Sequence, residues 1–113
     1  MLNITQFAAV LDGIRLPHVY YSFPENGAPD LPYFVYYYAG TENMSADDVA
    51  YVEVLTPVVE LYTRTKSFDT ERTIEDALTA AGLFWDKTEE YLTTENMFMT
   101  TYEITGVLNG KQS

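Results

Sequence analysis

Proton transfer is the first chemistry to consider, and His18 is the single histidine of this 113-residue chain. Ser22 follows it on the same segment, which would suggest a nucleophile and its base. Four strand residues span roughly 13 Å, far beyond hydrogen-bond reach. We interpret His18 as a partly exposed strand residue, while a serine from another part of the fold stays an open alternative. Glu89 and Glu90 are adjacent, so a strand projects them to opposite faces and they cannot share a proton.

Cation binding is the second chemistry to consider. Asp47 and Asp48 lie in the sequence "NMSADDVA" and could join Glu42 around a metal ion. Their spacing matches no calcium loop, which would also need a glycine at its midpoint. The preferred interpretation is that Ser45 caps a short helical turn whose third residue is Asp48. We therefore expect no metal ion here, and the residues offer no catalytic constellation.

Three of the six basic residues, Arg64, Lys66 and Arg72, lie close together in the sequence. No glycine-rich loop accompanies them, so a phosphate site is disfavoured and a patch for an acidic neighbour is favoured. Between Arg15 and Arg64 the sequence has no lysine or arginine. The same interval holds seven acidic residues: Glu25, Asp30, Glu42, Asp47, Asp48, Glu53 and Glu60. One acidic and one basic surface per subunit would allow head-to-tail contacts that close a ring.

The bulk composition narrows the class of protein. Seventeen acidic and six basic residues give a net charge of −11, which disfavours binding to nucleic acid or to an anionic membrane. The chain has no cysteine, which excludes disulfides and thiolate zinc sites. We expect a single domain over residues 1–113, with a short polar C-terminal tail from about 107 and neither a leader peptide nor a membrane helix. Ten tyrosines, six phenylalanines and one tryptophan exceed what a core of this size readily hides, which favours a subunit of an assembly.

Two helices are predicted. The first runs from Ile4 to Asp12, with a capping box formed by Asn3 and Gln6 and a stop at Gly13. The second has an apolar stripe at helical spacing over residues 74–81 and ends at Gly82. Asp69 or Thr70 is its predicted cap.

Five strands are predicted, over residues 18–23, 33–39, 51–63, 83–92 and 97–108, and the last two form a hairpin. Pro57 interrupts the third, so it must lie at an edge or a bulge. Residues 40–50 are polar and acidic and are predicted to form a long loop. This order predicts an α+β fold: a mostly antiparallel four- to five-stranded sheet with two helices packed on one face.

Two short helices cannot cover both faces of such a sheet, and strand 33–39 carries aromatic side chains on each face. The face without helices must then meet something else, and a neighbouring subunit is the simplest candidate. Large side chains expected on that face are the candidate anchors: Tyr36, Tyr38, Met97 and Met99. The remaining interface candidates are the polar loop with Glu42, Met44, Asp47 and Asp48, and the basic residues Arg64, Lys66 and Arg72.

A family resemblance rests on a succession of segments. "VELYT" (59–63) is followed by "TERTIEDALTAAG" (70–82), "FWDKTEEYL" (84–92) and "ENMFMTTYEI" (95–104). Together with "LPYFVYYY" and "NMSADDVAYVEV", these resemble the tail completion, or tail terminator, proteins of long-tailed bacteriophages of the siphovirus type that infect Gram-positive bacteria. The likeness extends from the first helix to about Gly106.

The resemblance implies a structural virion protein without enzymatic activity and without a cofactor. Such proteins form a ring, usually a hexamer, on the head-proximal end of the tail tube. The ring ends tube growth and docks to the head–tail connector, and DNA passes through its lumen without specific binding. The resemblance also implies assembly in the host cytoplasm. We hypothesise that the acidic loop makes assembly contacts while nearby carboxylates line the channel. The alternatives are a head-side adaptor or head-closure protein, an acidic DNA-mimicking regulator and a small enzyme.

Overall fold

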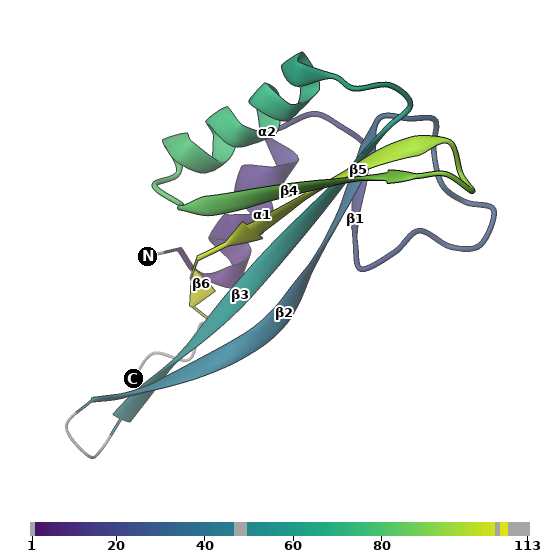
Figure 1. Cartoon of the computed structure of the whole chain (residues 1–113). Helices are drawn as coiled ribbons and strands as arrows, with labels where there is room; N and C mark the ends of the chain where they lie inside the picture. The colour runs from purple at the N-terminus through teal and green to yellow at the C-terminus, as the bar shows by residue number, and fades with distance from the viewer. Residues whose placement is uncertain (1, 47–49, 106, 109–113) are drawn as a thin grey trace.

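The computed structural model describes residues 2–46, 50–105 and 107–108. One sheet has the strand order β1 (His18–Tyr20), β2 (Tyr33–Ala46), β3 (Ala50–Thr63), β5 (Met97–Ile104), β4 (Trp85–Leu92). The short β6 (Val107–Leu108) also pairs with β3, and β1 is parallel to β2 whereas the other pairs are antiparallel. Helices α1 (Ile4–Asp12) and α2 (Phe68–Ala80) pack on one face of this sheet (Figure 1). The predicted fold class is confirmed, and the predicted strand 97–108 proves to be two, β5 and β6.

The core lies between the helices and the sheet. Fully buried side chains from α1 and α2 meet fully buried side chains from β2, β3 and β5: Phe7, Leu11, Ile74, Leu78, Phe34, Val59, Leu61 and Tyr102. Both helices present an apolar stripe at helical spacing, because each helix contacts the sheet with one side only. Within the described ranges no helix is long and apolar enough to cross a membrane.

The ends of α1 follow the prediction. The Gln6 backbone N–H donates to Asn3 Oδ1 at 2.8 Å, and the Asn3 backbone N–H donates to Gln6 Oε1 at 3.0 Å. This is a complete capping box, and Gly13 is the C-cap.

The start of α2 corrects the prediction, because its N-cap is Ser67 rather than Asp69 or Thr70. The Ser67 Oγ accepts from the Thr70 backbone N–H at 3.3 Å. With this earlier start, both Asp69 and Glu71 lie in the first turn, where the helix dipole favours negative charge. Gly82 follows the C-terminus with φ of +77°, which confirms the predicted stop.

Residues 40–46 and Ala50, predicted as part of a loop, are instead strand, so the prediction was wrong for these residues. β2 and β3 remain paired from Tyr33 opposite Tyr62 as far as Ala46 opposite Ala50. The pairing places Ser45 opposite Tyr51 and Ala46 opposite Ala50, whereas the rest of the predicted helical turn, residues 47 and 48, lies outside the described residues. The two strands leave the body as a long hairpin (Figure 1), and the principal dimensions of the molecule are 51 × 29 × 22 Å.

Pro57 lies at a bulge, as predicted. The register of β2 against β3 shifts between Tyr38, opposite Pro57, and Gly40, opposite Thr56. On its other side β3 pairs with β6 through Leu55 and with β5 from Val58 onward. Proline has no N–H to donate, and here it occupies the gap between those two partners.

Candidate assembly surfaces

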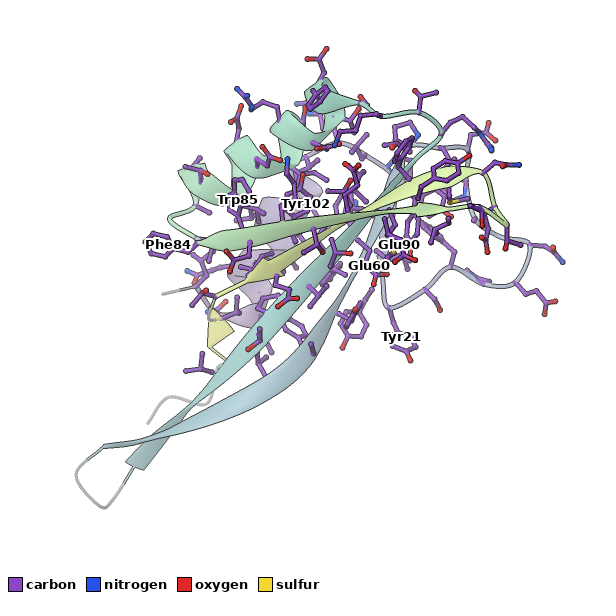
Figure 2. The ribbon with its side chains drawn as sticks, viewed as in Figure 1. Tyr21, Glu60, Phe84, Trp85, Glu90 and Tyr102 are labelled. Carbon is purple, nitrogen blue, oxygen red and sulfur yellow. The ribbon has the colours of Figure 1, made fainter. Side chains whose placement is uncertain are left out.

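The sheet face away from the helices is the first candidate surface, and we call it the open face. On β2 it comprises residues 33, 35 and 37, and on β3 residues 58, 60 and 62. On β4 it comprises the even-numbered residues, and on β5 the odd-numbered residues. The intervening residues, such as Leu61 and Tyr102, belong to the core. In Figure 2, Trp85 and Tyr102 lie on the α2 side of the β4–β5 ribbon, and Glu60 and Glu90 lie on its other side.

Tyrosines hold a carboxylate in place on the open face. Glu60 accepts from the Tyr37 hydroxyl at 3.0 Å and from the Tyr62 hydroxyl at 2.9 Å. Burial, followed by the hydrogen bond to Glu60, raises the pKa of both hydroxyls, so they remain donors at neutral pH. The Tyr62 ring in turn packs on the Tyr33 ring, with 5.4 Å between centroids. Glu60 is thus fixed between two aromatic rings.

Three further carboxylates lie on the open face, and all three are exposed. Asp86 is directly opposite Glu103 in the β4–β5 register, and Glu90 is opposite Met99. No ion pair among the described residues reaches these three or Glu60. The strand positions that form the open face hold no lysine or arginine. The surface therefore combines tyrosine and methionine with unneutralised negative charge.

Between α2 and β4, the carboxylates are neutralised by lysines of the same chain. Glu71 is 1% exposed, and its carboxylate accepts from Lys66 Nζ at 2.7 Å and from Lys87 Nζ at 3.1 Å. Lys87 also donates to Glu75 at 2.7 Å, and Lys66 donates to Glu89. Burial raises the pKa of Glu71, but the two lysines outweigh it and hold that pKa below its usual range.

The predicted basic cluster is therefore divided among different contacts. Lys66 is bound within its own chain by Glu71 and Glu89. Arg64 donates to the Asn96 carbonyl at 3.3 Å, and Arg72 is exposed on α2. The proposed role of these three side chains in contacts between subunits stays a prediction.

Two of the four predicted anchors lie on the wrong face. Tyr36 and Tyr38 were expected on the open face, but both rings pack on Phe7 of α1, at centroid distances of 6.1 and 6.3 Å. The Tyr38 hydroxyl is buried without a hydrogen-bond partner among the described residues, and burial raises its pKa to about 12. Met97 and Met99 do lie on the open face.

Sequence reasoning missed Tyr33, Tyr37, Tyr62 and Glu60 as one group. The alternation of side chains along a strand already placed Tyr33 and Tyr37 on one face of their strand, and Glu60 and Tyr62 on one face of theirs. The signal that was lacking was the register between the strands, which sets Tyr33 opposite Tyr62.

The β2–β3 hairpin is the second candidate surface. Its backbone register places Glu42 opposite Val54 and Met44 opposite Val52. Asp47 and Asp48, also predicted to make contacts, lie outside the described residues. Beyond Tyr36, β2 has no second neighbour among the described strands, because β1 pairs only with residues 34–36. Backbone N–H and C=O groups along that edge are available for strand pairing.

His18 contacts residues of its own chain that hold its ring in place. Its Nδ1 lies 2.7 Å from the Leu16 carbonyl oxygen, and its Nε2 lies 2.9 Å from Asp12 Oδ1. The ring stacks on Phe34, with 4.6 Å between centroids. Over the described part of the chain, no group of three or more histidine, aspartate or glutamate side chains is placed to hold a metal ion.

Comparison with known proteins gives a likeness of fold. No protein-family model and no curated protein matches the chain. A chain from a solved structure, described as the virion of a native gene transfer agent (GTA) particle, superimposes with a TM-score of 0.57 at 15% sequence identity. The match covers 91% of this chain and 84% of that chain. At this identity the shared property is the fold.

Proposed function

We propose that this chain is a structural virion protein that forms a ring at the head-proximal end of a phage tail tube, ends tail growth and joins the tail to the head. The class of protein is supported by the shared fold with a chain of the GTA particle, which extends over most of both chains. The partners are further copies of this chain, which form a hexamer as the family resemblance implies, together with the tail tube protein and the head–tail connector. The proposal assigns the chain no catalytic step.

The observation that carries the assembly role is the β2–β3 hairpin. Each of its strands has 14 residues, and the outer edge of β2 beyond Tyr36 has no partner among the described strands. Over residues 43–46 and 50–53, β2 and β3 pair only with each other among the described strands, and a two-stranded ribbon is marginal by itself in water. Its free edge is suited to pair with another subunit or with the tube.

Negative charge fits the proposed passage of DNA. With a net charge of −11 per chain, a ring would repel phosphates from its surface within a Debye length of roughly 8–10 Å. DNA would then pass without adhering to the wall.

The test shortens the hairpin and measures tube length. Residues 43–53 are replaced by Asn-Gly, which joins Glu42 to its partner Val54 through a two-residue turn. Tube protein should polymerise without limit alone and stop at a defined length with the wild-type chain, as measured by electron microscopy. The shortened chain should stay folded by circular dichroism and fail to stop growth.

A matched control keeps the hairpin and replaces Glu42 and Glu53 by Gln, which separates backbone pairing from charge. Normal capping by the shortened chain would exclude the hairpin as the assembly arm. Wild-type chain that binds connector rings but leaves tube growth unchanged would favour the head-side adaptor over the tail terminator.

A further inference from the structure

The open face carries like charges at close range. Side chains directly opposite each other on antiparallel strands have Cβ atoms roughly 4.5–5.5 Å apart, and like charges there are destabilising. Asp86 and Glu103 are such a pair, both are exposed, and no cation of the described residues pairs with either. A cation from outside the chain that meets both carboxylates would relieve this repulsion.

Aromatic rings accompany these carboxylates. In the strand register, Glu103 is opposite Val58, and Val58 is opposite Tyr37. Tyr37 and Tyr62 flank Glu60, whose carboxylate they hold by hydrogen bonds. A guanidinium group binds carboxylates through paired hydrogen bonds and stacks on aromatic faces, whereas a lysine ammonium acts as a compact point charge. The composition of the open face is thus suited to arginine.

A second copy of this chain is a poor source of the arginine. Lys66 and Lys87 are bound to carboxylates of their own chain, and Arg64 donates to Asn96. The two remaining arginines are exposed on separate segments, each with exposed carboxylates nearby in the sequence: Arg15 follows Asp12, and Arg72 lies on α2 with Asp69 and Asp76. The described part of the chain therefore has no concentrated basic surface, and each copy brings a net charge of −11.

We propose that the open face docks on an arginine-bearing surface of a different protein, with Asp86, Glu103 and Glu60 as the receiving carboxylates. This inference adds a docking partner to the proposed function, and it rests on that function in taking the partner to be another virion component. The charge of the face excludes DNA and anionic membrane as its occupant.

The probe is a fluorescein-labelled peptide in which four arginines alternate with serines, so that an extended peptide presents all four on one side. Binding is measured by fluorescence anisotropy, and its location by amide chemical-shift changes. The test variant combines Asp86→Asn with Glu103→Gln. The matched control combines Asp69→Asn with Asp76→Asn on α2 and removes the same amount of charge.

The open-face variant should bind the peptide about five- to tenfold more weakly, since it loses two exposed ion pairs, and the control less than twofold. Shift changes should concentrate on β3, β4 and β5, and a citrulline peptide should not bind. Equal loss in the control, or shifts confined to other elements, would show general attraction to an acidic protein and overturn the proposal.

Two further outcomes are distinguishable. If the open-face variant alters self-association without peptide and the α2 control does not, the face is a contact between copies and the proposal is wrong. Tube capping by the wild-type chain is measured separately. A failure to cap contradicts the proposed function, whereas the peptide result tests only the docking of arginine on the open face.

Discussion

At the scale of single residues, the distribution of positive charge decides which surfaces remain acidic. Two of the few lysines, Lys66 and Lys87, are used to neutralise Glu71, Glu75 and Glu89 between α2 and β4. A buried carboxylate such as Glu71 requires this, because an unpaired charge in the interior is costly. The carboxylates of the open face are left without cations as a consequence.

Replacing Glu71 by Gln should lower the free energy of unfolding by about 1–3 kcal/mol, because two lysines lose their shared acceptor. Both lysines are partly exposed and can turn to water, which limits the loss. Urea denaturation at pH 7 measures the effect. Glu89→Gln, an exposed partner of Lys66, is the control and should cost less than about 1 kcal/mol. A larger loss for Glu89→Gln would contradict this account.

The difference in stability between the wild type and Glu71→Gln should depend on pH. The pKa of Glu71 is lower in the folded state, so its stabilising contribution is present above the unfolded pKa of about 4.3 and is lost as pH falls through the folded pKa. The stability difference between wild type and Glu71→Gln should therefore stay constant from pH 7 to 5 and narrow below about pH 4.5. A difference that grows in acid would assign the contribution to another group.

At the scale of elements, the ends of helices and strands are set by a few backbone positions. α2 begins at the Ser67 cap and ends before Gly82, whose φ of +77° lies in the left-handed region. The N–H of Gly82 donates to the Thr79 carbonyl, and that of Leu83 donates to the Leu78 carbonyl. These bonds return the chain toward β4, so the conformation of Gly82 positions the edge strand that bears Asp86.

Gly82→Ala should lower the free energy of unfolding by about 1 kcal/mol, because an L side chain is strained at positive φ although nothing lies within 4 Å of the added Cβ. Gly40→Ala is the matched control, since it also has open space but no positive φ. It should change stability by no more than about 0.5 kcal/mol. Thermal denaturation compares the two, and equal effects would contradict backbone strain as the cause.

At the scale of the whole molecule, shape and charge act together. The chain is 51 Å long in its principal direction, and the hairpin extends it beyond the helix-covered body (Figure 1). Copies with a net charge of −11 repel one another, so in the proposed ring paired strand edges and other uncharged contacts must provide the attraction. This differs from assembly through complementary charged patches.

Self-association should therefore strengthen with salt. Raising the ionic strength from about 0.1 to 1 M shortens the Debye length from about 10 to 3 Å and screens the repulsion between copies. Sedimentation velocity at both salt concentrations should show a shift toward the ring. Weakening by salt would instead support contacts between the basic residues Arg64 and Arg72 and an acidic neighbour. Binding of the arginine peptide has the opposite sign and should weaken with salt.

Much of the fold could be predicted because its signals are local. The capping box of Asn3 and Gln6, the stop at Gly82 and the bulge at Pro57 depend on neighbours within a few positions. The candidate site could be predicted less well. All four anchors were predicted on the open face, but the structure has only Met97 and Met99 there, whereas Tyr36 and Tyr38 pack on Phe7.

The sequence by itself determined the α+β class, both helices, the alternation of each strand and the surplus of negative charge, because composition and periodicity fix these. Tertiary structure alone decided which side of the alternation meets the helices, and it placed Tyr33 and Tyr37 rather than Tyr36 and Tyr38 on the open face. It also decided that residues 40–46 pair as strand, since an acidic hairpin lacks an apolar pattern and is held by its partner strand. Both outcomes depend on contacts between residues distant in sequence, which no local pattern encodes.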